Sequence, residues 1–351
     1  MIITNQLKTL EFLIPSYKRP HTVIEAVKSV ALQVEKLQLS SRVKITIVDD
    51  CSPNINSSEM INNISAFSSF VTFKQNTVNK GMSLNIRDMV ANSDADFCTI
   101  LTDDDRLQPD SLKQIIETID KIDKNDSNSL ISSFFVPRYS YLEDKSLNCI
   151  VCQPFEEDTL IKASPLNSIK NLHNGFILTG LFFRPKLINF NLWDDNIENS
   201  FFPVIYFADL LLNYDCLFIN KNWFIHTVLN ECHWDSWGKT EQARQARLYK
   251  DYMKAVTVSS QRAISRLSGM LTIIPLWKEE FICYQRQIEC NIQKLNPNDR
   301  KINPLTFSRI SYKLAIVNFY ISRLKYRIRI ILSKIKRLVI NIKTIKINSI
   351  S

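Results

Sequence analysis

The feature that most constrains this chain is a regular alternation of short apolar runs and helix-spaced segments across its first third. Residues 10–15 and 43–48 are apolar and rich in β-branched side chains, and residues 23–39 between them repeat apolar side chains at helical spacing. This succession predicts a strand, a helix and a second, parallel strand. Such alternation is typical of α/β proteins, whose ligands bind beyond the carboxyl ends of the strands. We therefore expect functional side chains in the segments that follow the strands.

The alternation continues beyond this first unit. It predicts strands over residues 70–74 and 97–101 and helices over residues 82–90 and 110–122. Pro109 stands at the start of the last of these helices, where its missing N–H costs nothing. The expected fold is a doubly wound, mostly parallel sheet.

The middle region mixes short apolar runs with polar loops, and we expect it to complete the same sheet. The runs lie at residues 131–136, 149–153 and 176–183. A helix over residues 203–212 and a strand over residues 216–219 then close this body, and the pattern beyond is helical. We predict a doubly wound domain over residues 1–235 and a helical C-terminal region over residues 236–351.

Charge is distributed unevenly along the chain. The formal net charge is +9, from 44 Lys and Arg against 35 Asp and Glu. Residues 300–351 hold thirteen of the basic residues and none of the acidic ones, which leaves 31 basic against 35 acidic residues before them. A slightly acidic body with a basic tail indicates that the tail binds a polyanionic surface.

The tail alternates apolar and basic residues from about position 305 onward, which predicts a basic amphipathic helix. Such a helix lies in the headgroup layer of an anionic bilayer, where basic side chains contribute to binding. Nucleic acid is the competing polyanion, but no recognition module accompanies the tail, so we expect no nucleic-acid partner. A solvated or partner-binding helix is the alternative.

The cysteines and the hydropathy profile bear on the compartment. Eight cysteines are scattered through apolar neighbourhoods, which predicts reduced core thiols and no disulfide framework. No run approaches the ~20 apolar residues of a membrane span, and the first residues lack the pattern of a secretory signal. We expect a cytoplasmic protein that is peripheral on the inner face of the plasma membrane.

The strongest local feature is the row of carboxylates Asp103, Asp104 and Asp105, which directly follows the strand expected over residues 97–101. A divalent cation is the natural compensator for this charge. Mg²⁺ and Mn²⁺ prefer oxygen ligands and bind through one or two carboxylates while substrate phosphates complete the shell. The alternative is a turn whose aspartates cap the helix after Pro109.

Three other strand ends carry polar side chains. The first loop offers Tyr17, which can stack on a nucleobase, and the second strand ends in Asp49 and Asp50, which can accept from base or ribose donors. Asn79 and Gly81 precede the helix expected over residues 82–90. Each is a common strand-end loop by itself, but together they predict one cleft with base, ribose, phosphate and metal functions.

These motifs, in this order, resemble the family 2 glycosyltransferases of the GT-A fold. The family signature is P-x-Y-N-R, V-D-D-x-S, N-x-G and then a D-x-D-type acidic motif. The matching residues here are Pro15, Tyr17, Arg19, Asp49, Asp50, Ser52, Asn79, Gly81 and Asp103 to Asp105. The chain departs from the signature at Lys18, which replaces the asparagine of the first motif.

The resemblance implies a Rossmann-like, doubly wound mixed sheet with a C-terminal helical extension, and a nucleotide-diphosphate sugar as donor. It implies that Tyr17 and either Asp49 or Asp50 hold the base, and that Asn79 lies near the ribose or the sugar. The other implied donor-binding residues are Pro15, Arg19, Gly81, Asn85 and Asp104.

A closer likeness is to the abequosyltransferase-like branch of the family. It rests on Asn79-x-Gly81-x-x-x-Asn85 and on the acidic segment that runs through Asp104 and Asp105 to Leu112. This likeness implies transfer of a sugar, such as a deoxy- or dideoxyhexose, to a lipid-linked oligosaccharide in O-antigen or surface polysaccharide synthesis.

The family mechanism needs a metal and a base. The resemblance implies that Asp103 and Asp105 bind Mn²⁺ or Mg²⁺, which stabilises the leaving diphosphate, and that a carboxylate deprotonates the acceptor in an inverting transfer. The family places that carboxylate near the helix after the middle strands, where this chain offers Glu198 and Asp209. We keep both candidates, and also the possibility that neither acts as the base.

Two rival functions stay open at this point. A nucleotidyltransferase also joins a nucleotide-binding sheet to paired carboxylates, but it normally carries a glycine-rich basic loop after the first strand, and residues 16–19 contain no glycine. A catalytically silent, membrane-associated scaffold with the same fold is the other rival. Product formation from a sugar nucleotide excludes it.

Overall fold

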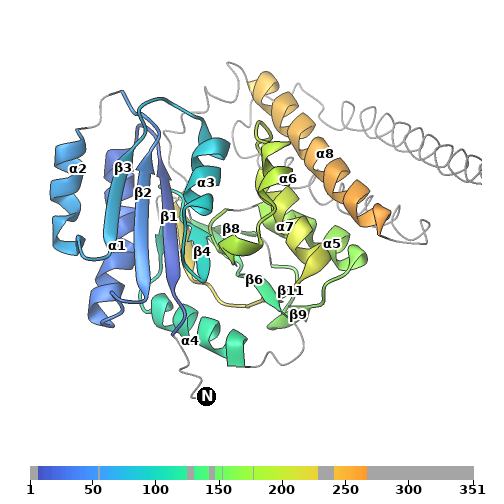
Figure 1. Ribbon diagram of the computed structural model, residues 1–351, viewed down its shortest axis with the longest axis horizontal. Helices are drawn as coiled ribbons and strands as arrows, with labels where there is room; N and C mark the ends of the chain where they lie inside the picture. The colour runs from blue at the N-terminus through green and yellow to red at the C-terminus, as the bar shows by residue number, and fades with distance from the viewer. Residues whose placement is uncertain are drawn as a thin grey trace, which may run out of the picture. The chain divides into compact units, whose positions relative to one another are not determined.

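The computed structural model describes residues 7–53, 56–124, 130–141, 147–151, 153–176, 178–227 and 241–266. Its centre is an eight-stranded sheet with the order β3-β2-β1-β4-β10-β6-β11-β9, covered by helices on both faces (Figure 1). A second, four-stranded sheet has the order β5-β12-β7-β8. The predicted α/β class with a mixed, doubly wound sheet is confirmed.

The first half of the large sheet is parallel. Its strands are β1 (Leu10–Ser16), β2 (Val43–Asp49), β3 (Val71–Gln75) and β4 (Phe97–Ile100). β1 pairs in parallel with both β2 and β4, and β2 pairs in parallel with β3. All four lie within one residue of their predicted bounds. β1 and β4 are buried almost throughout, whereas the edge strand β3 is mostly exposed.

The second half of the sheet is mixed. β10 (Leu181–Phe183) lies antiparallel between β4 and β6 (Ile131–Phe135). β11 (Asp215–Phe218) runs parallel to β6, and β9 (Thr159–Ile161) closes the edge in antiparallel orientation. The strand predicted over residues 176–183 is therefore too long.

The second sheet was not predicted. It is built from β5 (Asp105–Leu107), β12 (Phe224–Thr227), β7 (Arg138–Tyr141) and β8 (Leu147–Val151). The prediction that the run at residues 149–153 joins the large sheet is wrong, because its strand pairs with β7. The pairing of β5 with β12 joins residues more than a hundred positions apart, which local sequence pattern does not specify.

The helices separate into two layers, whose apolar faces form two core clusters with the sheet between them (Figure 1). The helices of the first layer are α1 (Pro20–Lys36), α2 (Ser57–Ile64) and α4 (Ser111–Lys124). Those of the second are α3 (Met82–Ala91), α6 (Phe190–Asp194) and α7 (Phe202–Asn213). Short helices α5 (Pro165–Asn171), η1 (Ser65–Phe67), η2 (Leu172–Phe176) and η3 (Pro185–Leu187) complete the described connections.

Side chains that alternate along a strand enter opposite core clusters. Phe12 of β1 lies in the first cluster and Leu13 in the second, and Phe134 and Phe135 of β6 divide in the same way. Phe134 also stacks on Phe182 of β10, with ring centroids 4.4 Å apart. Aromatic packing thus joins the parallel and antiparallel parts of the sheet.

Helix α8 (Glu241–Ser265) packs against α5 and α7 within the same compact unit as the sheet. The predicted domain boundary after residue 235 lies in residues 228–240, outside the described part of the chain, and so does the basic tail from residue 300. The boundary and the amphipathic tail therefore stay predictions. Within the described residues, no helix is both long and apolar enough to cross a bilayer.

Candidate functional site

The carboxyl ends of β1, β2 and β3 meet at one edge of the sheet, the upper edge in Figure 1. Helix α3 begins at this edge, and α6 and the first turn of α7 lie at the same end of the molecule. The sequence motifs that follow β1 to β4 are thereby brought together. This edge is the candidate site.

The loop after β1 presents an aromatic ring and two cations. Pro15 is half-buried within β1, while the Tyr17 side chain is 40% exposed and lies beneath the Lys18 ammonium group, 4.9 Å from the ring centroid. Lys18 has a left-handed backbone (φ 62°), and its N–H donates to the Ser52 hydroxyl over 2.7 Å. Tyr17 is therefore accessible for stacking on a ligand ring.

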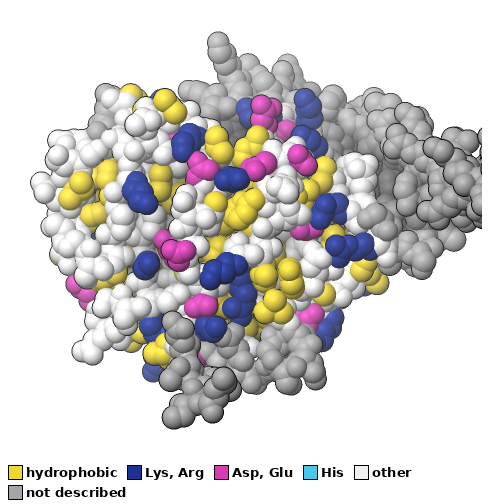
Figure 2. Space-filling model, in the orientation of Figure 1, with side chains coloured by type: hydrophobic (Ala, Val, Ile, Leu, Met, Phe, Trp, Pro, Cys, Tyr) yellow, Lys and Arg dark blue, Asp and Glu magenta, His cyan; other side chains and the backbone are white. Residues whose placement is uncertain are grey.

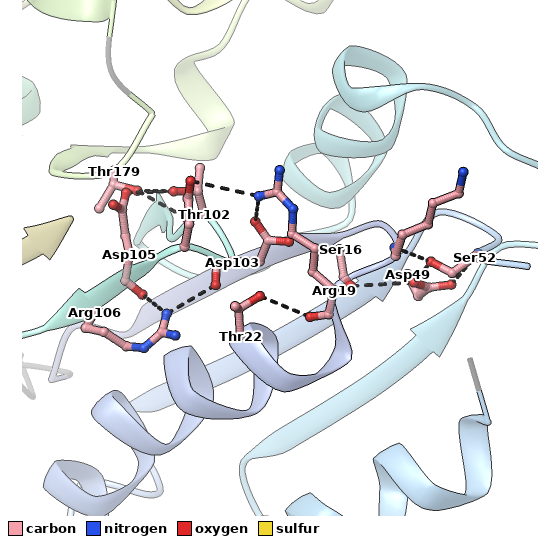
Figure 3. A network of polar contacts seen from close by, with 12 residues as sticks. Ser16, Arg19, Thr22, Asp49, Ser52, Thr102, Asp103, Asp105, Arg106 and Thr179 are labelled. Atoms are coloured by element: carbon pink, nitrogen blue, oxygen red, sulfur yellow. Dashed lines mark hydrogen bonds and ion pairs between the residues drawn. The ribbon is translucent and has the colours of Figure 1, made fainter. Parts of the chain in front are cut away.

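Asp49, at the end of β2, is buried and surrounded by neutral donors (Figure 3). Its carboxyl group accepts from the Ser52 N–H at 2.8 Å, the Ser52 hydroxyl at 2.6 Å, Gln75 at 3.1 Å and Ser16 at 3.5 Å. These contacts tie together the ends of the first three strands. The prediction was that this carboxyl group accepts hydrogen bonds from the nucleobase, but donors of the protein already occupy its oxygens.

Asp50 does the same for the loop before α3. Its carboxyl group accepts from the backbone N–H groups of Lys80 at 2.9 Å and Gly81 at 2.8 Å, and from the Asn76 amide at 2.9 Å. Gly81 has φ +81°, a conformation that glycine adopts without strain. Asp50 thus fixes the loop that leads into α3.

The two asparagines of this loop differ in exposure. Asn79 is exposed, and its side-chain oxygen accepts from the Gly81 N–H at 3.0 Å in a local turn. Asn85 is buried, donates to the Val48 carbonyl at 3.2 Å and accepts from Asn76 at 3.0 Å. Asn79 is therefore open to a ligand, whereas Asn85 joins α3 to β2.

The acidic row after β4 has cationic partners (Figure 3). Arg19 donates to the Asp103 carboxyl group at 3.1 Å and lies 3.9 Å from that of Asp104. Burial raises the pKa of Asp103 to about 7, an effect that Arg19 opposes and the neighbouring carboxylate of Asp104 increases. The first loop and the acidic row thus form one ionic cluster.

Asp105 is fully buried at the start of β5. One oxygen of its carboxyl group accepts from the Thr102 hydroxyl at 2.6 Å and lies 3.5 Å from the Arg138 guanidinium of β7. The Thr102 hydroxyl is in turn 3.1 Å from that of Thr179 (Figure 3). The second sheet therefore supplies the counter-charge for the last carboxylate of the row.

The acidic row fits a divalent cation in part. Within the described residues no cluster of three or more His, Cys, Asp or Glu side chains forms a metal cage. Mg²⁺ and Mn²⁺ need fewer protein ligands when phosphate oxygens supply the remainder, and the partly exposed side chains of the row are those of Asp103 and Asp104. Asp103 lies at the surface of the row with a 13% exposed side chain, whereas the Asp105 carboxyl group is enclosed.

The two candidate bases occupy different surroundings. Glu198 is exposed in the turn between α6 and α7. Asp209 lies two turns into α7, is buried, and is ion-paired with Arg262 of α8. The carboxyl group of Glu198 is thus accessible, and that of Asp209 joins two helices.

The α3–α6 junction beside the site carries paired charges. Arg87 donates to both carboxyl oxygens of Asp194 at 2.9 Å, and Lys80 pairs with Asp88 at 2.8 Å. Figure 2 shows acidic and basic side chains intermingled on this face, near the upper edge. The Trp193 indole also donates to Ser83 at 3.2 Å. These contacts connect the Gly81 loop to the segment that leads to Glu198.

Sequence reasoning missed Arg138 and Thr179, which complete the surroundings of Asp105. A single arginine in an apolar strand gives no local signal, because its relation to Asp105 depends on the pairing of β7 and β5 through β12. The contribution of Ser52 was signalled by the V-D-D-x-S motif, and the structure defines it as the link between the first two loops.

The comparisons with known proteins agree with the first half of this site. The family described as "Glycosyl transferase family 2" matches residues 11–177, just under half of the chain. This match confirms the resemblance to family 2 over that segment and, with the mixed sheet, the predicted GT-A fold. No curated protein sequence matches the chain.

Distant likenesses to solved structures were also found. A crystal structure of S. aureus TarS 1–349 is 16% identical with a TM-score of 0.48, over 78% of this chain and 79% of that one. TarS 1–349 in complex with UDP-GlcNAc is also 16% identical, with a TM-score of 0.47 over 80% and 81% of the two chains. Similarity at this level assigns neither substrate nor site residues to the present chain.

Proposed function

We propose that this chain, whose residues 11–177 match the family 2 glycosyltransferases, transfers a sugar from a nucleotide-diphosphate donor to a hydroxyl group of an acceptor. The observation that carries the proposal is the ionic cluster of Arg19, Asp103 and Asp104 beside the exposed ring of Tyr17. Base stacking, a guanidinium for phosphate and carboxylates for a cation then lie at one edge of one sheet.

The protein side chains divide the work as follows. Tyr17 stacks on the base, and Asn79 binds the ribose or the sugar. Asp49 and Asp50 act mainly by fixing the loops that carry these side chains, because their oxygens already accept hydrogen bonds from the protein. Arg19 is within reach of both the acidic row and an incoming diphosphate, to which a guanidinium binds strongly.

Asp103 and Asp105 are the proposed ligands of Mg²⁺ or Mn²⁺, with Asp104 beside them. When bound, such a cation stabilises the negative charge of the leaving diphosphate. The Thr102 hydroxyl and Arg138 orient the Asp105 carboxyl group. Arg19 balances the charge of Asp103 and Asp104 in the ligand-free site.

Glu198 is the proposed base of an inverting transfer. Its side chain is exposed in the turn before α7, whereas the other candidate, Asp209, is occupied by Arg262. Replacement of Glu198 by Gln keeps the shape and removes the basicity, so turnover is expected to fall by ~100-fold with donor affinity preserved. Asp209→Asn is the comparison: a larger loss of turnover than in Glu198→Gln would transfer the role to Asp209.

The donor is identified by a screen of the purified protein against UDP-, CDP-, GDP- and dTDP-sugars, scored by nucleotide release with Mg²⁺, with Mn²⁺ and with a chelator. We expect release from one nucleotide class and its loss in the chelator. Absence of release from every sugar nucleotide would contradict the proposed function. Equal release in the chelator would contradict the metal requirement alone.

The proposed setting is surface polysaccharide synthesis on a lipid-linked oligosaccharide, with the basic tail on the anionic inner face of the plasma membrane. The support is the tail's charge of thirteen basic and no acidic residues over residues 300–351. Flotation with anionic and neutral vesicles compares the full chain with a chain ending at Asn303. The full chain alone is expected to float with anionic vesicles and to detach as salt rises. Equal flotation of both chains contradicts the membrane role.

A further inference from the structure

The turn that carries Glu198 is fixed from a distant part of the sequence. Its neighbours on both sides are anchored: Ile197 packs against the second core cluster, and Asn199 is 1% exposed. The Asn199 side chain accepts from the Phe201 N–H at 2.7 Å and donates to the backbone carbonyl of Asp251 at 2.9 Å. Within the described residues of this turn the Glu198 side chain is exposed, as is that of Asp195 directly after α6.

Asp251 of α8 is the acceptor around which the turn is organised. Its carboxyl oxygen accepts from the Ser200 hydroxyl at 2.8 Å and from the Ser200 N–H at 3.2 Å, and its side chain is 15% exposed. Arg247, one helical turn earlier, lies 3.9 Å from the same oxygen. The next residue, Tyr252, is fully buried and packs edge-on against Phe201 at 5.4 Å.

The remaining contacts of α8 with α7 lie farther from the site. Arg262 pairs with Asp209, and Arg266 donates to the Asn213 side chain at 2.7 Å. The contacts of Asp251, Arg262 and Arg266 fall at successively later positions before and along α7. The two helices therefore run parallel. Asp251, near the middle of α8, contacts the turn that leads into α7, whereas Arg262 and Arg266 contact its last turns.

We propose that Asp251 is a positioning residue, which acts through the Asn199–Ser200 turn to hold the Glu198 carboxylate where the acceptor hydroxyl group is deprotonated. The inference rests on the proposed function of Glu198. A carboxylate that accepts two hydrogen bonds from one residue fixes both the backbone and the side chain of that residue. Because a general base acts only within hydrogen-bond reach of its proton, a small displacement of the turn lowers the rate of the chemical step and not donor binding.

The test compares Asp251→Ala, which removes the acceptor, with Asp251→Asn, which keeps one acceptor oxygen. Arg266→Ala is the matched control, since it removes a contact between the same two helices at the far end. Hydrogen exchange of residues 195–202 in the full chain reports the turn directly. We expect exchange to accelerate about tenfold in Asp251→Ala, and to stay at the wild-type rate in the control.

Kinetics on the sugar nucleotide that the donor screen selects give the second readout. In Asp251→Ala, kcat is expected to fall about tenfold while KM for the donor stays within about twofold, and Asp251→Asn is expected to recover most of the loss. In a Glu198→Gln background the Asp251 substitution is expected to cause no further loss, because both changes affect one step.

Additive losses in the double variant, or equal effects of Asp251→Ala and Arg266→Ala on kcat, overturn the inference and leave the proposed function in place. Full activity of Glu198→Gln overturns the base assignment, and the positioning role with it. Lack of turnover on every sugar nucleotide contradicts the proposed function itself. In that case hydrogen exchange still tests the contact, and an unchanged exchange rate of residues 195–202 in Asp251→Ala shows that Asp251 does not hold the turn.

Discussion

Two acidic segments flank β1 in the sheet, and their surroundings differ in kind. Asp49 and Asp50, after β2, accept hydrogen bonds from neutral N–H and O–H groups, three or more each. Asp103 and Asp105, after β4, lie beside guanidinium groups. A carboxylate whose oxygens all accept hydrogen bonds from neutral donors has a structural role. A carboxylate paired with an arginine side chain can exchange that side chain for a bound ligand.

The largest effect is expected from Asp105→Asn. The amide keeps an acceptor for Thr102 but removes the charge that a metal requires, so nucleotide release should fall by ~100-fold or more. Asp110→Asn is the matched control, because Asp110 is exposed and pairs only with the surface residue Lys36 within the described chain. Turnover of Asp105→Asn within about tenfold of wild type would falsify the metal assignment.

Asp103→Asn tests the comparison through the pH dependence of the free energy of unfolding. The pKa of Asp103 is about 7 in the folded protein and near 4 when unfolded, so the folded state binds the proton more tightly. Ionisation therefore destabilises the fold increasingly from about pH 4 to about pH 7 and by a constant amount above that. Asp103→Asn avoids this cost, and we expect it to gain roughly 2 kcal/mol at pH 8 and almost nothing at pH 4.

The measurement is urea denaturation of wild type and Asp103→Asn across this pH range. Loss of the charged partner of Arg19 offsets part of the gain, which is why we expect less than the ~4 kcal/mol that a shift of three pKa units corresponds to. A stability difference that is independent of pH would show that Asp103 does not titrate in this range.

Asp50→Ala tests the structural side of the comparison. It leaves the N–H groups of Lys80 and Gly81 without their acceptor, which should cost about 2 kcal/mol of unfolding free energy. Because the loop carries Asn79, KM for the donor should also rise. Thermal denaturation and donor titration measure the two effects. A variant with wild-type stability and weaker donor binding would instead make Asp50 a direct ligand of the donor.

The smallest effect is expected from Asn79→Ala. The side chain is exposed and makes one local hydrogen bond to the Gly81 N–H, so stability should change by about 0.5 kcal/mol. Donor binding should weaken if Asn79 contacts the ribose or the sugar. Isothermal titration with the nucleotide separates the two roles: unchanged affinity removes Asn79 from the site.

The sequence predicted the first half of the molecule well and the second half less well. Strands β1 and β4 are mostly apolar and buried, β2 is largely so, and the motifs after β1 to β4 fall at one edge as expected. β5 and β10 have only three residues each, too few for a periodic signal. Their positions depend on long-range pairing with β12, β4 and β6.

The site residues were likewise predicted better in the first half of the molecule than in the second. Tyr17, Asp49 and Asp103 were found because each lies at the end of a strand that the pattern defines, or within three residues of that end. Arg138 and Asp251 were missed because their partners, Asp105 and Ser200, are distant in sequence, and a lone charged residue on a strand or helix carries no local mark of its contact. The pattern also did not distinguish Glu198 from Asp209, since the ion pair with Arg262 depends on how α8 packs.

The place of β10 in the sheet bears on how the chain folds as it is synthesised. β4 has one neighbour, β1, until β10 is made, so an emerging chain that ends before Leu181 leaves the other edge of β4 unpaired. That edge includes Phe97, which packs against Phe134 in the complete protein. Unpaired edges and exposed aromatic side chains favour aggregation, and pairing between distant strands is slow. An emerging chain that lacks β10 therefore exposes an edge of β4 that the complete protein covers, and it is more prone to aggregation than the complete protein.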